Sequence, residues 1–135
     1  GVSAFANEMR CKLVTPSALL LDEPVTYASV PMWDGLMGFL PGRAPILGRL
    51  GMGELKISFP DSKRGEGSTR RYYVEEGFVR MADNQITILA EAAIPAEELT
   101  RSQIDAEIKA AGTDAKKGAR ARAKAQILAA GGGAI

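Results

Sequence analysis

Apolar and polar residues alternate in several short stretches along the first two thirds of the chain. Between residues 9 and 13 apolar side chains alternate with basic ones, and Leu55, Ile57 and Phe59 repeat the pattern. This period of two is that of a β-strand with one buried face. Further candidate strands lie at residues 19–21, 25–30, 71–74, 78–81 and 86–90. Many short strands at this spacing predict a β-sandwich, or flattened barrel, over residues 8–94.

Turn-forming residues separate these candidate strands. The tripeptide at residues 22–24, Asp-Glu-Pro, is expected to part the strands at residues 19–21 and 25–30. The pairs Asp-Gly at residue 34 and Asp-Asn at residue 83 favour tight turns, because glycine and asparagine tolerate a positive φ. Residues 61–69 contain two glycines and mixed charges, and we expect an exposed hairpin loop there.

A helical period replaces the alternation after Pro95. Glu97 and Glu98 suit the start of a helix, where the backbone dipole favours negative charge. Gly112 is expected to end this helix, because glycine readily adopts the left-handed conformation of a C-terminal cap. The apolar residues that fall on one face between these points are Leu99, Ile104, Ile108 and Ala111.

A second helix is predicted directly after the first. Thr113 or Asp114 can cap it by accepting hydrogen bonds from free backbone N–H groups. Its apolar residues recur every four positions, at Ala115, Ala119, Ala123 and Ile127. Residues 95–130 are therefore expected to form an antiparallel αα-hairpin. An alanine seam buries little apolar area, so the hairpin needs packing against another surface and should be able to detach from it.

The predicted fold class is accordingly mainly β plus α, with an N-terminal β-sandwich and a C-terminal two-helix hairpin. The formal net charge of +1 provides no overall attraction to nucleic acid or acidic lipid. No stretch reaches the ~18 apolar residues that a membrane-spanning helix needs. Membrane association would therefore depend on another subunit.

The chain lacks most of the residues that common catalytic and metal sites require. The chain has no histidine and one cysteine, Cys11, for which a buried position is expected. This excludes zinc sites of the usual kind and catalysis by Cys-His or Ser-His-Asp groups. No phosphate-binding loop is present, and the acidic pairs are expected to be solvated turn or helix-start charges. We predict no catalytic residues, no metal and no cofactor, and hence no enzyme.

The most informative stretch is residues 34–47, which read DGLMGFLPGRAPIL. It resembles the signature of ATP synthase epsilon chains, in which an acidic-Gly-x-x-Gly-x-x-Pro-Gly-His-x-Pro-Leu-Leu run links two strands. Other segments resemble the family's motifs in the same order, and they lie at residues 13–16, 25–31, 50–57, 73–79 and 88–91. The resemblance covers roughly residues 9–130 and includes the terminal two-helix hairpin. The mitochondrial counterpart of this subunit, under another name, has the same architecture.

The resemblance implies a non-catalytic rotor subunit in the central stalk of a rotary ATP synthase. In that family the sandwich binds the gamma shaft and rests on the membrane c-subunit ring. The hairpin either folds on the sandwich or extends toward the catalytic alpha/beta head, where it restrains ATP hydrolysis. The resemblance also implies a peripheral position on the cytoplasmic face of the bacterial inner membrane. A free-standing β-sandwich adaptor that reuses this fold is the alternative.

The same resemblance assigns candidate contact residues for the shaft and the ring. These are Leu36, Met37, Gly38, Pro41, Gly42 and Arg43. Two of them depart from the family pattern, since Arg43 replaces the usual histidine and Leu36 replaces an acidic residue that many members carry. For the glycines and prolines individually, shaping the turn is a better explanation than direct contact, because each has a backbone reason to be there. Nearby, Trp33 and Met32 fit either a core or an interface.

Two further expectations concern the helices. Some family members bind ATP through an Ile/Leu-Asp-x-x-Arg-Ala motif, but here Thr100 and Gln103 replace both charged residues, so we expect no tight ATP binding.

The second helix carries a basic set, which is Lys116, Lys117, Arg120, Arg122 and Lys124. These side chains either form a solvated face or, as the resemblance implies, meet acidic loops of the catalytic head. The set has no aromatic residue to stack on bases, which argues against nucleic-acid binding.

Overall fold

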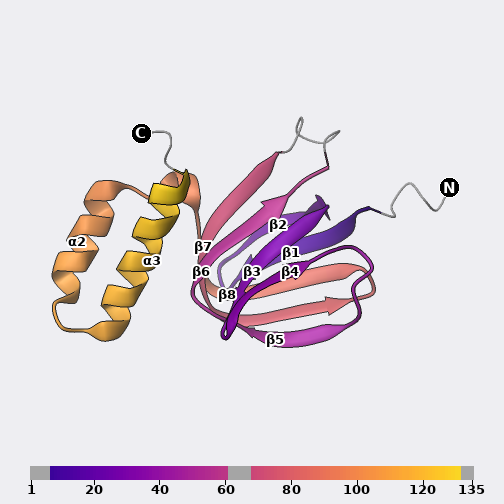
Figure 1. Cartoon of the computed structure of the whole chain (residues 1–135), viewed down its shortest axis with the longest axis horizontal. Coiled ribbons are helices and arrows are strands. Elements are labelled where there is room, and N and C mark those ends of the chain that lie inside the picture. Colours follow the sequence, from indigo (N-terminus) through magenta and orange to yellow (C-terminus); the bar gives the residue numbers. More distant parts are fainter. Residues whose placement is uncertain (1–6, 61–67, 132–135) are drawn as a thin grey trace.

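The structure is a computed structural model, and it describes residues 7–60 and 68–131. Within these residues, eight strands precede a short 3₁₀ turn and two helices (Figure 1). The strands are β1 (Met9–Thr15), β2 (Ala18–Val25), β3 (Tyr27–Met32), β4 (Gly35–Phe39), β5 (Ile46–Leu50), β6 (Gly53–Ser58), β7 (Thr69–Ala82) and β8 (Gln85–Pro95). The helical elements are η2 (Ala96–Glu98), α2 (Arg101–Ala111) and α3 (Ala115–Gly131).

The strands form one sheet that folds over on itself. Their order is β2-β1-β8-β7-β5-β3-β4, and β6 pairs with both β3 and β7. The first half of β7 pairs with β6 and its second half pairs with β5, while β3 pairs with both β5 and β6. These shared pairings close the sheet into two layers. The predicted β-sandwich is therefore confirmed, and the two helices form a hairpin beside it, as predicted.

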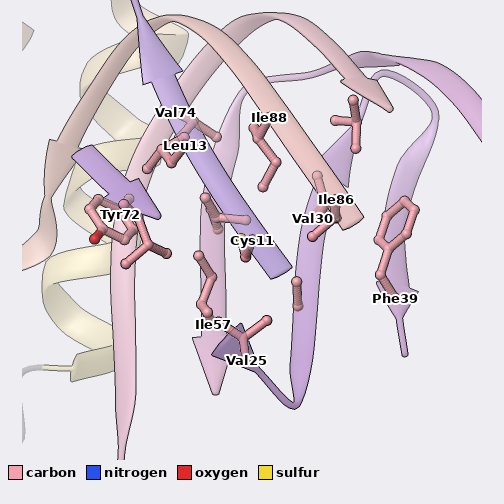
Figure 2. Close-up of a cluster of buried hydrophobic side chains, with 14 of the residues drawn as sticks. Cys11, Leu13, Val25, Val30, Phe39, Ile57, Tyr72, Val74, Ile86 and Ile88 are labelled. Atoms are coloured by element: carbon pink, nitrogen blue, oxygen red, sulfur yellow. The ribbon is translucent and has the colours of Figure 1, made fainter. Parts of the chain in front are cut away.

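Alternating residues of the strands fill the space between the layers (Figure 2). The side chains that are fully enclosed include Cys11, Leu13, Val25, Val30, Phe39, Leu55, Ile57, Val74, Val79, Ile86 and Ile88. Burial of each large aliphatic side chain in this way contributes about 1.5–3 kcal/mol to the free energy of folding. The expectation that Cys11 is buried is confirmed, and its burial raises the pKa of its thiol to about 12.

The prediction that the tripeptide at residues 22–24 separates two strands is wrong. Strand β2 runs through it, and the chain leaves the β conformation only at Thr26. Asp22 pairs in register with Lys12, and its carboxylate accepts a hydrogen bond of 2.7 Å from Arg10 Nε. Pro24 is tolerated because β2 is the edge of the sheet, where a missing backbone N–H breaks no ladder.

Residues 71–74 and 78–81 are likewise parts of one 14-residue strand, β7, and not two strands. The sequence pattern misleads because the strand exchanges its faces halfway. Tyr72 and Val74 point into the sandwich core, but after Gly77 the core residues are Val79 and Met81, which have the opposite parity. Strand β8, expected at residues 86–90, is also longer and runs from Gln85 to Pro95.

A backbone irregularity at residues 76 and 77 produces this exchange. Glu76 has a φ of +52° and Gly77 a φ of +154°. An added Cβ at Gly77 would lie 1.7 Å from the carbonyl oxygen of Leu89 on the neighbouring strand. The strand can therefore turn its faces here only because residue 77 has no side chain.

Apart from residues 22–24, the predicted turns that fall in the described residues are present. Gly35, the first residue of β4, has a φ of +129° directly after the turn at residues 33 and 34, and Asp83 and Asn84 both have positive φ in the two-residue turn between β7 and β8. Most of the loop expected at residues 61–69 lies outside the described residues, and Thr69 is the first residue of β7. The strands end at Pro95; the proposed domain boundary near this residue stays a prediction.

Asp114 and Gly112 act as predicted: Asp114 Oδ1 caps α3, and Gly112 ends α2 with a φ of +52°. The start of the first helix was predicted too early, because Glu97 and Glu98 lie in η2 and α2 begins only after Thr100, whose Oγ1 caps it. In α2, Ile104 is buried whereas Ile108 is exposed to solvent.

Ala111 of α2 is buried as expected, and Leu99 lies before that helix. In α3 the buried residues are Gly118, Ala121 and Ile127. Of the predicted stripe, Ile127 is buried and Ala123 packs against the Tyr73 cluster, whereas Ala115 is exposed. Helical periodicity gives the spacing of such a stripe but does not specify which residues meet the sandwich.

The close approach at Gly77 can be tested by substitution. Gly77→Ala should lower the free energy of unfolding by about 2–4 kcal/mol, because the new methyl group meets a backbone oxygen that cannot move freely. Gly42→Ala is the matched control, since its φ is +82° but nothing lies within 4 Å of the added Cβ, and it should cost about 1 kcal/mol. Urea denaturation measures both, and equal losses would contradict the steric explanation.

Candidate partner-binding surfaces

The six residues predicted to contact the shaft and the ring lie on β4 and the loop that follows it. Leu36, Met37 and Gly38 belong to β4, whereas Pro41, Gly42 and Arg43 lie in the loop before β5. Leu36 is 73% exposed, and Gly38, Gly42 and Arg43 are also exposed. Met37 instead packs against the sandwich core. The structure thus brings Arg43 beside Gly38 and the sulfur of Met37, whereas Leu36 lies near the other end of β4, next to the turn from β3.

The loop is attached to the turn between β7 and β8. The backbone N–H of Gly42 donates a hydrogen bond of 2.8 Å to Oδ1 of Asn84. The amide nitrogen of Asn84 donates a second bond of 2.8 Å to the carbonyl oxygen of Glu8. Sequence reasoning gave Asn84 only a role in its own turn. Its side chain also holds the loop, and no local pattern in the sequence signals that long-range contact.

The side chain of Arg43 folds back from the loop over β4. Its guanidinium carbon lies 5.3 Å from the centre of the Phe39 ring, within the range of a cation–π contact. Its Nη1 is 3.5 Å from the carbonyl oxygen of Gly38. The positive charge therefore sits beside the exposed face of β4, available to a partner that approaches there.

Met32 and Trp33, which the sequence left undecided, have different environments. Met32 is 6% exposed and belongs to the core. Trp33 is 68% exposed in the turn next to Leu36, although its backbone N–H bonds to the carbonyl oxygen of Arg49. Two large apolar side chains thus project from one tight turn, an arrangement typical of a contact surface.

A second apolar surface crosses the outer face of the sheet. In register, Phe78 of β7 pairs with Leu89 of β8, Leu89 with Val14 of β1, and Val14 with Leu19 of β2. Residues paired in register point to the same face, so these four side chains form a row across four adjacent strands. We call it the outer apolar row. Phe78 is 53% exposed, Leu89 48% and Leu19 59%.

A shallow hollow of about 310 Å³ lies along the outer apolar row. Its lining includes Val14, Pro16, Phe78 and Leu89 together with the carboxylate residues Glu76 and Glu91. An apolar floor with charged residues at its margin suits a partner side chain that is itself apolar. The alternation predicted strands here, but only the pairing of four strands places these residues side by side.

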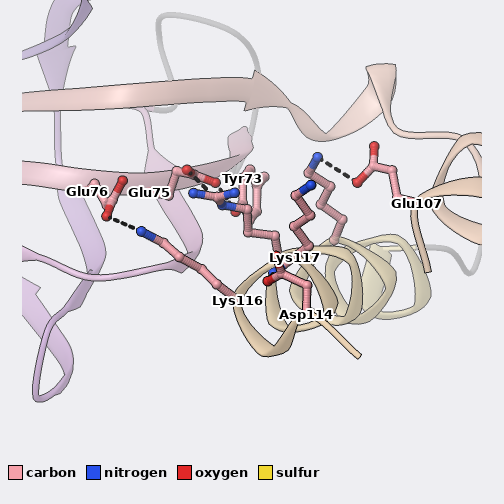
Figure 3. A network of polar contacts seen from close by, with 9 residues as sticks. Tyr73, Glu75, Glu76, Glu107, Asp114, Lys116 and Lys117 are labelled. Atoms are coloured by element: carbon pink, nitrogen blue, oxygen red, sulfur yellow. Dashed lines mark hydrogen bonds and ion pairs between the residues drawn. The ribbon is translucent and has the colours of Figure 1, made fainter. Parts of the chain in front are cut away.

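The basic set of α3 is divided between internal contacts and solvent (Figure 3). Lys116 pairs with Glu76 at 3.0 Å, and Lys124 pairs with Glu107 of α2 at 2.9 Å. The hydrogen bond from Lys116 holds the pKa of Glu76 below its usual value. The side chains of Lys117 and Arg122 are exposed and make no ion pair with any described residue.

The third internal contact of the basic set involves a buried carboxylate. Glu75 is only 9% exposed, and it accepts a short hydrogen bond from the Tyr73 hydroxyl. Its other oxygen lies 3.1 Å from Arg120 Nε, an ion pair that lacks the alignment of a hydrogen bond. Burial raises the pKa of the Tyr73 phenol, and the adjacent carboxylate raises it further. Tyr73 therefore stays a hydrogen-bond donor to Glu75 at physiological pH.

Apolar contacts complete the junction between the hairpin and the sandwich. Tyr73, Leu99, Ile104 and Ile127 form a small buried cluster separate from the sandwich core. The ammonium group of Lys124 lies 5.2 Å from the centre of the Tyr73 ring.

Arg71 of β7 also holds the last turns of α3. Its Nη2 donates a hydrogen bond of 2.6 Å to the carbonyl oxygen of Ile127, and its Nε pairs with Glu54. The junction thus combines a small apolar cluster with several charged contacts.

Thr100 and Gln103, which replace the charged residues of the ATP motif, form the N-terminal cap of α2. The Thr100 hydroxyl oxygen accepts a hydrogen bond of 3.2 Å from the backbone N–H of Gln103 and so caps α2. Among residues 7–60 and 68–131, no group of three or more His, Cys, Asp or Glu is placed to hold a metal ion. In the same described part of the chain, no helix combines the length and the apolar character needed to cross a bilayer.

Comparison with known proteins connects this arrangement with one family. The model of the β-sandwich domain of ATP synthase delta/epsilon chains matches residues 8–96. An ATP synthase epsilon chain of Rhodopirellula baltica is 35% identical over 95 residues, which cover 70% of each chain. The chain belongs to the ATP synthase delta/epsilon chain family. The resemblance seen in residues 34–47 is thereby confirmed.

Other members of the family match over different lengths. An ATP synthase epsilon chain of Solibacter usitatus is 34% identical over 129 residues, covering 89% of this chain and 92% of that relative. One from Nitratidesulfovibrio vulgaris is 34% identical over 93 residues, and the match spans 65% of that relative, just under two thirds. The longer alignment includes residues of the helical hairpin as well as the sandwich.

Solved structures share the fold at lower identity. A chain in the Euglena gracilis mitochondrial ATP synthase, solved with OSCP, F1 and the c-ring, superposes with a TM-score of 0.71 at 20% identity, covering 87% of this chain and 75% of that chain. A chain of the central stalk and c-ring of the Tetrahymena thermophila mitochondrial ATP synthase gives 0.63 at 20% identity, covering 87% and 94%. This likeness concerns the fold.

The buried hydrogen bond between Tyr73 and Glu75 gives a test of the junction. Tyr73→Phe should lower the free energy of unfolding by about 1–3 kcal/mol, because a buried carboxylate loses its donor. Tyr72→Phe is the control, since the Tyr72 hydroxyl only accepts a longer bond of 3.3 Å from Arg70. Urea denaturation should show a smaller loss, about 1 kcal/mol, for the control. A Tyr73→Phe variant as stable as the wild type would show that Glu75 needs no donor.

Proposed function

We propose that the chain is a non-catalytic subunit of the central stalk of a rotary ATP synthase. Its membership of the delta/epsilon chain family supports this role, as do the structural relatives found in ATP synthase assemblies. The observation that carries the proposal is the outer apolar row, in which four apolar side chains align across four adjacent strands and three of them are about half exposed. A rotor subunit has to be held firmly against the gamma shaft, and a sandwich built from one continuous sheet around an enclosed core can transmit torque through such a contact.

The outer apolar row is proposed as the surface that binds the gamma shaft. Exposed apolar surface of this extent is expected to be covered by a partner.

The β3–β4 turn with Trp33 and Leu36, together with Arg43 in the loop that follows β4, is proposed to face the c ring. Leu36 makes that contact apolar in place of the acidic one usual in the family. The chain would then lie at the cytoplasmic face of a bacterial inner membrane and be held there through the complex.

Replacement of two central residues of the row should weaken binding to the gamma subunit. Phe78→Ser combined with Leu89→Ser should weaken the affinity at least about thirtyfold, equivalent to about 2 kcal/mol, because two large apolar contacts are lost. The measurement is a calorimetric titration of the chain with the gamma subunit of the same synthase. Circular dichroism establishes in parallel that the doubly substituted sandwich remains folded, as expected for exposed positions.

Ile108→Ser is the matched control for this experiment. Ile108 is also an exposed apolar residue, but it lies on α2 and outside the sheet, so its replacement should leave the affinity unchanged. Unchanged affinity in the Phe78 and Leu89 variant would reject the row as the shaft site. Failure of the wild-type chain to bind the gamma subunit at all would favour the adaptor role.

The exposed cations of α3 provide a test of contact with the catalytic head. Lys117→Ala combined with Arg122→Ala should reduce inhibition of ATP hydrolysis by the reconstituted head, because these two charges make no ion pair within the described chain. The effect should shrink as salt is raised, since screening weakens exposed charge pairs. Hydrolysis rates are measured in a titration of the head with the chain.

Arg101→Ala with Lys109→Ala removes the same charge from α2 and serves as the control. Equal effects of the two double variants would indicate a response to net charge alone. The other cations, Lys116, Arg120 and Lys124, are unsuitable for this comparison, because their internal ion pairs also hold the hairpin.

A further inference from the structure

Glu76 has an unusual backbone conformation for its residue type. The other two non-glycine residues with positive φ in the described chain are Asp83 and Asn84, which form a tight turn. Aspartate and asparagine tolerate the left-handed region because their short side chains bond to the nearby backbone. Glu76 lies within β7, has a φ of +52° and has a longer side chain. Its conformation is therefore strained, and the strain has to be compensated by other contacts.

The conformation places two consecutive carboxylates against one helix. In a regular strand Glu75 and Glu76 would point to opposite faces of the sheet. Here Glu75 pairs with Arg120 and Glu76 pairs with Lys116, and these two cations are four residues apart on the same side of α3. Figure 3 shows both carboxylates directed at the helix. A strand without the left-handed residue would offer α3 one carboxylate only.

We propose that Glu76 is a latch residue that holds the helical hairpin on the sandwich at the expense of the sandwich's own stability. The left-handed backbone strains β7, and the ion pair with Lys116 compensates for that strain only while the hairpin is docked. Loss of the Glu76 side chain should therefore affect the hairpin and the sandwich in opposite directions. Removal of Glu76 should loosen the hairpin and, at the same time, stabilise the sandwich. This property belongs to the chain by itself and does not depend on the stalk role.

Two thiols in one molecule can report the two effects separately. Cys11 is fully buried in the sandwich core, so it reacts only when the sandwich opens. Ala123 of α3 is partly buried against the Tyr73 cluster, so a thiol introduced by Ala123→Cys reacts when the hairpin leaves the sandwich. Reaction with iodoacetamide at pH 8, followed by mass spectrometry of the peptides, gives both rates. Circular dichroism first establishes that Ala123→Cys keeps its helix content.

In the Ala123→Cys protein, Glu76→Gly should accelerate modification of the introduced thiol about two- to fivefold, the range that a largely exposed ion pair supports. Lys116→Ala should accelerate it to a similar extent. When Lys116→Ala is already present, Glu76→Gly should not accelerate the introduced thiol further, because the two residues act through one contact. In that same background it should slow the modification of Cys11 about two- to fivefold, because the backbone strain is relieved.

Asp83→Gly is the matched control for the backbone. It replaces another residue with a φ of +52°, but one that lies in a turn and makes no ion pair with α3. It should leave the rate at the introduced thiol unchanged. The proposal is overturned if Glu76→Gly leaves that rate unchanged, or raises it no more than Asp83→Gly does. It is also overturned if Glu76→Gly speeds up the reaction of Cys11 in the Lys116→Ala background.

Discussion

The exchange of faces at Glu76 and Gly77 is the constraint on which both sides of the molecule depend. Before it, the outward residues of β7 are Tyr73 and Glu75, which receive the helical hairpin. After it, the outward residue Phe78 belongs to the outer apolar row. One strand thus supports the hairpin with its first half and a partner surface with its second. The exchange requires a glycine, because a side chain at residue 77 would meet the carbonyl oxygen of Leu89.

The sandwich core and the junction with the hairpin are held together by different kinds of contact. The sandwich core is apolar and enclosed, whereas the hairpin is attached by a small cluster around Tyr73 and by several charged contacts. Ion pairs that are largely exposed contribute little each and weaken with salt. Separation of the hairpin from a folded sandwich, as the proposed function requires, would break only contacts of this kind and leave the enclosed core intact. That difference is what a hairpin with two positions would need.

The turn residues and helix caps could be predicted because they act locally. Gly35, Gly112 and Asp114 were placed correctly, since each meets a requirement of its own backbone or of a neighbour a few residues away. The contact residues on β4 were proposed only through resemblance, and their role remains a prediction. The outer apolar row could not be found from the sequence, because Val14 and Leu89 are far apart in the chain and become neighbours only through a parallel strand pair.

The sequence by itself determined the strand-rich first part, the two helices, the absence of histidine chemistry and the family, through local periodicity and a spaced run of glycines and prolines. The tertiary structure alone decided which residues share a surface. It made β7 continuous, turned α3 so that Lys116 and Arg120 face the sandwich, and exposed Trp33 while burying Met32. The physical reason is that periodicity fixes how residues repeat within an element. Which of its faces is buried depends on the neighbouring elements, and long-range pairing determines those.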